Sequence, residues 1–139
     1  MSSIEPRRAL LDTSVLLDFS AMQVAEFADE IAVSSISIAE LQYEVTAASD
    51  PLVQLERRRY VQALVDHVDV MPFDVPCAEY YGLLASLVRH HGRNPWPRRL
   101  DLQMAATAAC NKLTLLTRNG ADFEGLESAL TVIDLRAAE

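Results

Sequence analysis

Short apolar segments with the length of β-strands alternate along this chain with longer segments of helical periodicity. Strands are predicted at residues 9–12, 31–34, 68–71, 113–117 and 131–133. Helices are predicted between them, at 15–27, 37–48, 52–65 and 77–88, and from Asp101 onward. This alternation favours a largely parallel sheet that is covered by helices on both faces. The fold class is therefore expected to be α/β.

The chain has the size of one folding unit. Its 139 residues are enough for a domain that buries about two thirds of its unfolded surface. Segment 92–99, with two prolines and a glycine, is expected to be a loop. The sequence contains no internal repeat, low-complexity tract or linker, so we expect a single domain over residues 1–139.

The composition is that of a globular protein with a packed core, because 50% of the residues are apolar and 23% are charged. Charged or polar residues interrupt every apolar stretch well before the roughly 20 residues that span a bilayer. The first eight residues are not followed by the apolar core of a secretory signal. We therefore expect a cytoplasmic protein that does not contact a membrane.

The two cysteines, Cys77 and Cys110, are far apart in the sequence and form no C-x-x-C motif. A disulfide framework or a zinc site is therefore not expected, and both residues are predicted to be reduced thiols in the core.

The formal net charge of −8 opposes binding to nucleic acids at long range, since affinity for phosphates depends on Lys and Arg. Positive charge is nevertheless concentrated in the arginine run 57–59 and in segment 89–99. Bound cations would also cancel part of the negative charge. The distribution of charge is therefore more informative than its sum.

Four acidic residues, Asp12, Glu40, Asp101 and Asp122, lie where predicted strands or helices begin or end. In open parallel sheets, ligands bind beyond the carboxyl ends of the strands, where the strand order reverses. If folding brings the four carboxylates to that edge, protonation or a cation must relieve their repulsion. The pattern therefore predicts a metal site.

Each acid also has an ordinary structural interpretation. Asp12 and Asp101 could be helix N-caps, and Asp122 could be a turn aspartate. Ser37 and Glu40 have the spacing of a capping box. The occurrence of all four acids at ends of elements favours the functional interpretation over four separate structural ones.

Four motifs carry a resemblance to a known family. They are Leu-Leu-Asp-Thr-Ser at 10–14, the serine-rich segment that ends in Glu-Leu at 34–41, the helix start at 101–106, and the segment from Leu-Leu-Thr-Arg-Asn to Gly at 115–125. In this order the motifs resemble those of PIN domains of the VapC kind, the toxins of bacterial toxin–antitoxin pairs. The resemblance spans nearly the whole chain.

This resemblance implies a PIN-like α/β/α sandwich and Mg²⁺-dependent endoribonuclease activity that hydrolyses RNA phosphodiester bonds, with Mn²⁺ as a possible substitute. Asp12 and Asp101 match the principal metal-binding aspartates of the family, and Glu40 matches a third acid of the site. The fourth position is open between Asp122, which we slightly prefer, and Asn119. The hydroxyls of Thr13, Ser14 and Thr117 could contribute, although the resemblance does not fix their roles.

Substrate contacts are predicted at arginines near the site, namely Arg93, Arg98, Arg99 and Arg118. Trp96 could stack on a base or could instead anchor its loop to the core.

The resemblance also implies a cognate antitoxin that inhibits the enzyme. The amphipathic stretches 17–27 and 52–65 could offer apolar stripes to an antitoxin helix or to a second copy of the chain, and we predict a homodimer.

Two alternatives remain. A receiver-like signalling domain would also use acids and Mg²⁺, but it needs a lysine late in the chain, whereas Lys112 is the only lysine and precedes the strand at 113–117. A non-catalytic PIN-like module that only binds a protein partner would tolerate the loss of Asp12 or Asp101.

Overall fold

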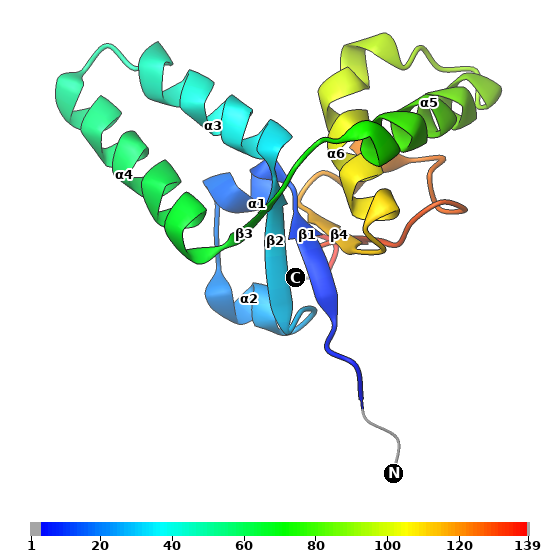
Figure 1. Ribbon diagram of the computed structural model, residues 1–139, viewed down its shortest axis with the longest axis horizontal. Helices are drawn as coiled ribbons and strands as arrows, with labels where there is room; N and C mark the ends of the chain where they lie inside the picture. Colours follow the sequence, from blue (N-terminus) through cyan, green and yellow to red (C-terminus); the bar gives the residue numbers. More distant parts are fainter. Residues whose placement is uncertain (1–3, 139) are drawn as a thin grey trace.

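The centre of the computed structural model, which describes residues 4–138, is a five-stranded parallel sheet (Figure 1). The strand order is β3-β2-β1-β4-β5, and every neighbouring pair is parallel. The strands are β1 (Arg8–Leu11), β2 (Glu30–Ser34), β3 (Asp69–Met71), β4 (Thr114–Thr117) and β5 (Val132–Asp134). The predicted parallel sheet is confirmed, and each strand lies within one residue of its predicted bounds.

The strand order reverses between β1 and β4. From β1 the chain first adds β2 and β3 on one side, and later adds β4 and β5 on the other. Leu11 pairs with Leu116, and the backbone N–H of Asp12 donates to the carbonyl of Leu116 at 2.9 Å. The carboxyl ends of β1 and β4 therefore lie side by side at a position that binds ligands in open α/β sheets.

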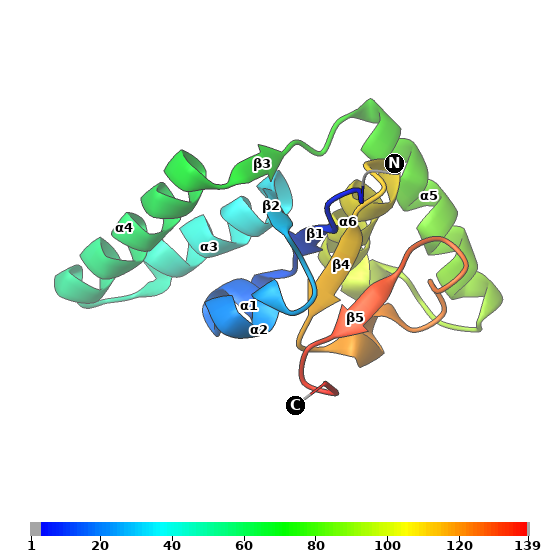
Figure 2. The same ribbon diagram turned by 90° about the horizontal axis from the view of Figure 1, so that it is seen from below.

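Helices cover both faces of the sheet (Figures 1 and 2). Leu10 and Leu115 face the cluster formed with α5 and α6, whereas Leu11 and Leu116 face the cluster formed with α1 to α4. Alternate residues of a strand point to opposite faces, which explains this division. The helices are α1 (Thr13–Leu17), α2 (Ala21–Ala25), α3 (Ser35–Ala47), α4 (Pro51–His67), α5 (Val75–His90) and α6 (Arg99–Cys110). This arrangement confirms the expected α/β/α sandwich.

Two of the predicted elements are wrong in detail. The single helix predicted at 15–27 is two short helices, because α1 ends at Leu17 and the hydroxyl of Ser20 caps α2 by accepting from the N–H of Gln23 at 3.3 Å. The predicted loop at 92–99 contains the 3₁₀ helix η1 (Trp96–Arg98) and already includes the first residue of α6. The fixed φ of proline suits the first turn of a helix, which explains helical structure in this proline-rich segment.

Helix α6 is a rigid support for one of the predicted site residues. Along most of its length its side chains are buried between α5 and the sheet. Its small residues Ala105, Ala106 and Ala108 are fully buried and allow close approach of the neighbouring elements. Asp101 is thereby held in the first turn of a helix that cannot shift without disturbing the core. None of the helices in residues 4–138 has the length and apolar character needed to cross a bilayer.

Candidate metal centre

Asp12 lies directly after β1 and is only 5% exposed. It occupies the N-cap position of α1, but its side chain makes no capping hydrogen bond. Instead Oδ2 accepts from the hydroxyls of Ser14 and Thr117, each at 2.7 Å. Burial raises the pKa of Asp12 above its ordinary value, and these two hydrogen bonds partly offset that effect. The capping interpretation of Asp12 is therefore wrong, since its carboxylate points to the end of β4.

Glu40 lies in the second turn of α3 rather than at its start. The helix begins at Ser35, and its cap is Ser34, whose hydroxyl accepts from the N–H of Ser37 at 3.0 Å. The capping box expected at Ser37 and Glu40 is therefore wrong. The Glu40 carboxylate accepts from the hydroxyl of Thr13 at 2.9 Å. Burial raises its pKa, and the negative charge of Asp12 raises it further.

Asp101 lies in the first turn of α6, two residues after the helix begins, and is not its N-cap. Its pKa is raised to about 6. Burial is the largest cause, and three negative neighbours add to it: Asp12, Asp122 and Glu40. The positive charge of Arg98 opposes these effects. The structure therefore brings all four predicted acids close enough for each of the other three to disfavour the charged form of Asp101.

Asp122 is held by the 3₁₀ helix η2 (Gly120–Phe123), which follows β4. The N–H of Gly120 donates to Oδ2 of Asp134 at 3.0 Å, which fixes the start of η2 against the end of β5. The guanidinium of Arg98 forms an ion pair with Asp122 and lies 3.7 Å from the carboxylate of Asp101. A side chain of this protein thus supplies positive charge at the rim of the acidic cluster.

Asn119, the other candidate for the fourth position, is exposed. Its backbone N–H donates to the hydroxyl of Thr117 at 3.0 Å. The charge of Asp122, by contrast, raises the pKa of both Asp12 and Asp101. Of the two candidates, Asp122 is therefore the one whose charge acts on the other acids.

The spacing of the acids suits a hydrated ion. No three of the described acidic residues bring carboxylate oxygens within 4.8 Å of one another. Mg²⁺ typically keeps several waters and contacts only one or two carboxylates directly. A group of four carboxylates, with hydroxyls behind them and no thiol or imidazole among the predicted ligands, fits a hard divalent cation. Such a cation would also relieve the repulsion that raises the pKa of Asp101.

The surrounding hydroxyls form a second layer behind the acids. Ser14 Oγ accepts from the backbone N–H of Arg118 at 3.0 Å while it donates to Asp12. Thr117 is fully buried and is hydrogen-bonded to Asp12. These contacts join the chain after β1 to the chain after β4. The sequence indicated that these hydroxyls were available, but only the fold shows which carboxylate each of them orients.

The other arginines predicted to bind substrate differ in their surroundings. Arg118 lies beside Asp18, with its Nε 3.4 Å from the carboxylate. Arg93 forms an exposed ion pair with Glu124 at 2.6 Å. The Arg99 guanidinium stacks 4.4 Å above the ring of Trp96.

Trp96 itself is 64% exposed, so the proposal that it anchors its loop to the core is wrong. The stacked pair of Trp96 and Arg99 forms a planar, positively charged surface in the segment that leads into Asp101.

Sequence reasoning missed the ion pairs of Arg98, although its position three residues before Asp101 is a helical spacing that brings side chains together.

Comparison with known proteins gives consistent matches along the chain. The family model described as "PIN domain" matches residues 9–127. Ribonuclease VapC5 of Mycobacterium tuberculosis is 28% identical over 137 residues, which cover 96% of this chain and 98% of that protein.

Two solved structures give the same picture. VapBC-5 from Mycobacterium tuberculosis, a member of the VapBC family of toxin–antitoxin systems, superimposes with a TM-score of 0.76 and 29% identity over 92% of this chain and 97% of that chain. FitAcB from Neisseria gonorrhoeae superimposes with a TM-score of 0.76 and 26% identity over 92% of this chain and 98% of that chain. These matches confirm the resemblance that the four sequence motifs carry. Because the family model also covers most of the residues, this chain belongs to the PIN-domain family.

Proposed function

We propose that this protein is a Mg²⁺-dependent endoribonuclease that acts as the toxin of a toxin–antitoxin pair. The observation that carries the proposal is the convergence of four carboxylates at the strand-order reversal, with the pKa of Asp101 raised to about 6. Partly buried carboxylates that repel one another cost stability, and such a cost is typical of functional sites. The name of the curated relative, Ribonuclease VapC5, supports RNA as the substrate.

The proposed roles follow from the environment of each acid. Asp12 and Asp101 would hold the ion, because they are the acids placed directly at the strand end and on the buried helix. Glu40 and Asp122 would complete the site and orient the attacking water. When bound, Mg²⁺ would lower the pKa of a water molecule and offset negative charge on the scissile phosphate and the leaving oxygen. Mn²⁺ prefers the same oxygen ligands and should replace Mg²⁺.

The RNA backbone is proposed to approach over η1. Arg98 and Arg99 supply positive charge beside the acids, and exposed Trp96 offers a ring on which an unpaired base can stack. Single-stranded segments of RNA present such bases, which favours loops or ends as targets. Hydrolysis by water in line with the leaving oxygen would yield 5′-phosphate and 3′-hydroxyl ends.

The proposal is tested by incubating the purified protein with total RNA and mapping new 5′ ends by sequencing. We expect discrete cuts with 5′-phosphates in Mg²⁺ or Mn²⁺, none in EDTA, and none with Asp101→Asn. Asp66→Asn on the exposed face of α4 is the matched control and should cut like the wild type. Equal cleavage in EDTA would refute metal dependence, and equal cleavage by Asp101→Asn would refute the assigned site.

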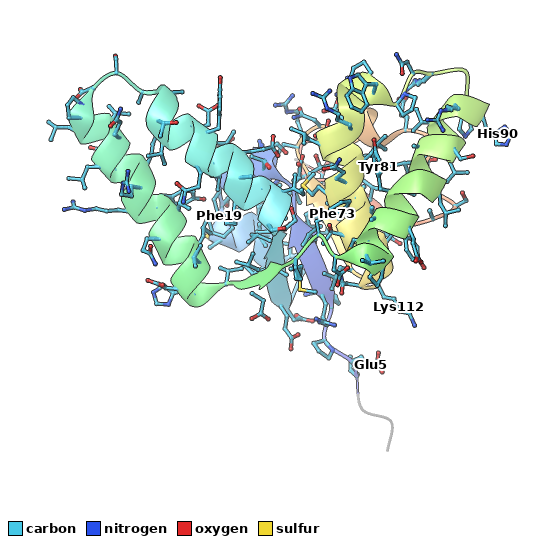
Figure 3. All side chains as sticks on the ribbon, turned by 45° about the horizontal axis from the view of Figure 1, so that its top comes forward. Glu5, Phe19, Phe73, Tyr81, His90 and Lys112 are labelled. Atoms are coloured by element: carbon cyan, nitrogen blue, oxygen red, sulfur yellow. The ribbon has the colours of Figure 1, made fainter. Side chains whose placement is uncertain are left out.

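The proposed partner is an antitoxin. The similar structure VapBC-5 is described as a member of a family of toxin–antitoxin systems. A groove of about 430 Å³ lies between α1, α3 and α4. Its apolar lining includes Leu16, Leu17, Phe19, Leu41 and Val61, and Figure 3 marks Phe19 beside the α3–α4 hairpin. Leu17 is 66% exposed and Phe19 is 46% exposed, so the groove presents apolar side chains to solvent. We propose that this activity is cytoplasmic, as expected from the sequence.

The proposed occupant of this groove is an amphipathic antitoxin helix, with apolar residues toward Leu17 and Phe19 and charged residues toward Glu44, Glu56 and Arg57 at the rim. The test is co-purification with the protein encoded beside the gene for this chain. Leu17→Lys should abolish co-purification, and Leu83→Lys on α5 should not. The opposite pattern would place the antitoxin elsewhere.

We also propose that the protein forms a homodimer through α5, whose outer face exposes Val75 (71%), Leu83 (63%) and Tyr80 (38%). Light scattering should give the mass of a dimer for the wild type and of a monomer for Leu83→Lys. A monomeric wild type at every concentration would contradict this proposal.

A further inference from the structure

A group of three side chains of metal-ligand type lies at the other end of α6 from the acids. One ligand atom each of Asp74, Cys77 and Cys110 lies within 4.8 Å of the other two. Among the described residues, no other three His, Cys, Asp or Glu side chains bring their ligand atoms this close together. Cys110 is the last residue of α6 and Asp101 is in its first turn, so the nine-residue rise along the helix separates the two groups by about 13 Å.

The antiparallel packing of α5 and α6 creates this group. Asp74 is the N-cap of α5, Cys77 lies in the first turn of that helix, and Cys110 ends α6. Figure 3 shows Lys112, which follows α6, at the start of α5, and His90 at its opposite end. Two cysteines that are 33 positions apart in sequence are thus brought together by helix packing, which is why the sequence pattern did not predict a site.

We propose that Asp74, Cys77 and Cys110 form a binding site for a soft divalent cation, with Zn²⁺ as its natural occupant and a solvent molecule as the fourth ligand. Thiolates select Zn²⁺ over Mg²⁺, and two sulfurs, one carboxylate oxygen and one water make a tetrahedral set. Zn–S bonds of about 2.3 Å place two tetrahedral sulfurs about 3.8 Å apart. The present spacing, below 4.8 Å, needs a closure of about 1 Å or less to reach that geometry.

The immediate surroundings supply groups that could support thiolates once a cation is bound. Oδ1 of Asp74 accepts from the N–H of Cys77 at 3.2 Å, and this capping bond holds the carboxylate beside the Cys77 side chain. The side-chain amide of Asn111 lies 4.0 Å from Cys77 Sγ and can donate to that sulfur when it is charged. The N-terminus of the 16-residue helix α5 favours negative charge at Cys77, but burial and the hydrogen bond to the Asp74 side chain outweigh it and raise the pKa of the thiol to about 11, so a bound cation would have to take the place of the thiol proton.

The site has an entry path and a defined proton balance. Cys77 is fully buried, but Cys110 is partly exposed and Asp74 is exposed, so an ion can reach the sulfurs from the surface. Binding of one Zn²⁺ to the two thiols releases two protons, because each ligand must be a thiolate. The ion would join the start of α5 to the end of α6 and would stabilise the half of the fold that carries Asp101.

Co²⁺ is a suitable probe, because its bonds to thiolates absorb in the near ultraviolet and its tetrahedral complexes absorb strongly in the visible. The whole protein, kept reduced, should take up one Co²⁺ with both absorptions, and one equivalent of Zn²⁺ should abolish them. Cys110→Ser should lose the thiolate absorption, and Asp74→Asn should keep it but bind Co²⁺ about tenfold more weakly. Cys110 is only partly buried, so its serine variant is expected to fold.

Asp12→Asn is the control that separates this proposal from the proposed ribonuclease site, since it should retain the full Co²⁺–thiolate absorption. Zn²⁺ should also raise the melting temperature of the wild type and of Asp12→Asn, but not that of Cys110→Ser. The absence of thiolate absorption in the reduced wild type would overturn the proposal. A Cys77–Cys110 disulfide that forms in air, together with no Co²⁺ binding after reduction, would show a redox pair instead and would equally overturn it.

Discussion

The guanidinium of Arg98 forms an ion pair with the carboxylate of Asp122. The same guanidinium lies 3.7 Å from the carboxylate of Asp101, in the first turn of the helix that follows Arg98. Arg98 is therefore a positive charge in direct contact with two of the four acids. It therefore competes electrostatically with the proposed cation, and its removal should expose the metal site.

Arg98→Ala should bind Mn²⁺ about twofold to fivefold more tightly than the wild type in the absence of RNA, since exposed ion pairs have small free energies. The titration is best made by calorimetry at pH 8, where the acids are ionised. In mild acid the gain should disappear, because the loss of Arg98 raises the pKa of Asp101 further. Arg58→Ala on exposed α4 is the control and should bind Mn²⁺ like the wild type. Weaker Mn²⁺ binding by Arg98→Ala at pH 8 would show that the arginine does not compete with the ion.

Thr117→Val tests the hydroxyl that donates to Asp12 at 2.7 Å. The substitution keeps the shape of a fully buried side chain but removes this donor and leaves the N–H of Asn119 without its acceptor. Mn²⁺ affinity should fall about tenfold, as for other groups that orient metal ligands. The free energy of unfolding should fall by about 1 to 3 kcal/mol. Thr117→Ser should restore most of the Mn²⁺ affinity and most of the free energy of unfolding. A folded Thr117→Val with unchanged Mn²⁺ affinity would show that the Thr117 hydroxyl does not orient Asp12.

Gly120→Ala tests the placement of Asp122. A Cβ atom at Gly120 would lie 2.7 Å from Oδ2 and 3.0 Å from Cβ of Asp134, so either η2 and β5 move apart or the Asp134 carboxylate turns away and the hydrogen bond that fixes the start of η2 is lost. RNA cleavage at limiting Mg²⁺ should fall about tenfold or more, because a shift of about 1 Å at a catalytic group is costly. Gly82→Ala on α5 is the control, because a Cβ atom at Gly82 has nothing within 4 Å. This variant should be more stable by up to about 1 kcal/mol and should cleave RNA like the wild type. Unchanged cleavage by Gly120→Ala would mean that the position of Asp122 is not critical.

Asp101→Asn should stabilise the metal-free protein at neutral pH. The folded pKa of about 6 lies above the usual value of 3.8, so ionisation of Asp101 costs stability. This cost is fully present above pH 6 and vanishes as the pH falls below 3.8. Since Asp101 is partly exposed, the expected gain is about 1 to 2 kcal/mol, less than the full shift implies. Urea unfolding in EDTA at pH 7.5 and pH 4 measures it, and a gain that is equal at both pH values would contradict the raised pKa.

The sheet could be predicted because strands buried on both faces are nearly continuous apolar runs, as at residues 113–117. The break between α1 and α2 could not. Leu16 and Val24 keep helical spacing across it, and both are buried in the same cluster. Only the packing of two short helices against the sheet shows that the chain turns at Ser20.

The sequence could predict those residues of the candidate site that directly follow a strand. Asp12 follows β1, and Asp122 follows β4 by way of a short turn, so both are placed by topology. The surroundings of Glu40 were misread because its spacing from Ser37 matches a capping box, whereas α3 starts two residues earlier. The pairing of Arg98 with Asp122 depends on how η1 packs beside η2, and sequence spacing carries no information about that contact.

The central claim is that the four carboxylates bind the cation on which RNA cleavage depends. The most direct test measures Mn²⁺ occupancy and the initial rate of RNA cleavage on the same samples, for the wild type and for Asp12→Asn. The account predicts that the wild-type rate rises in parallel with occupancy of one site, and that Asp12→Asn loses both. Cleavage by Asp12→Asn at the wild-type rate, or cleavage that does not change with Mn²⁺ occupancy, would contradict it.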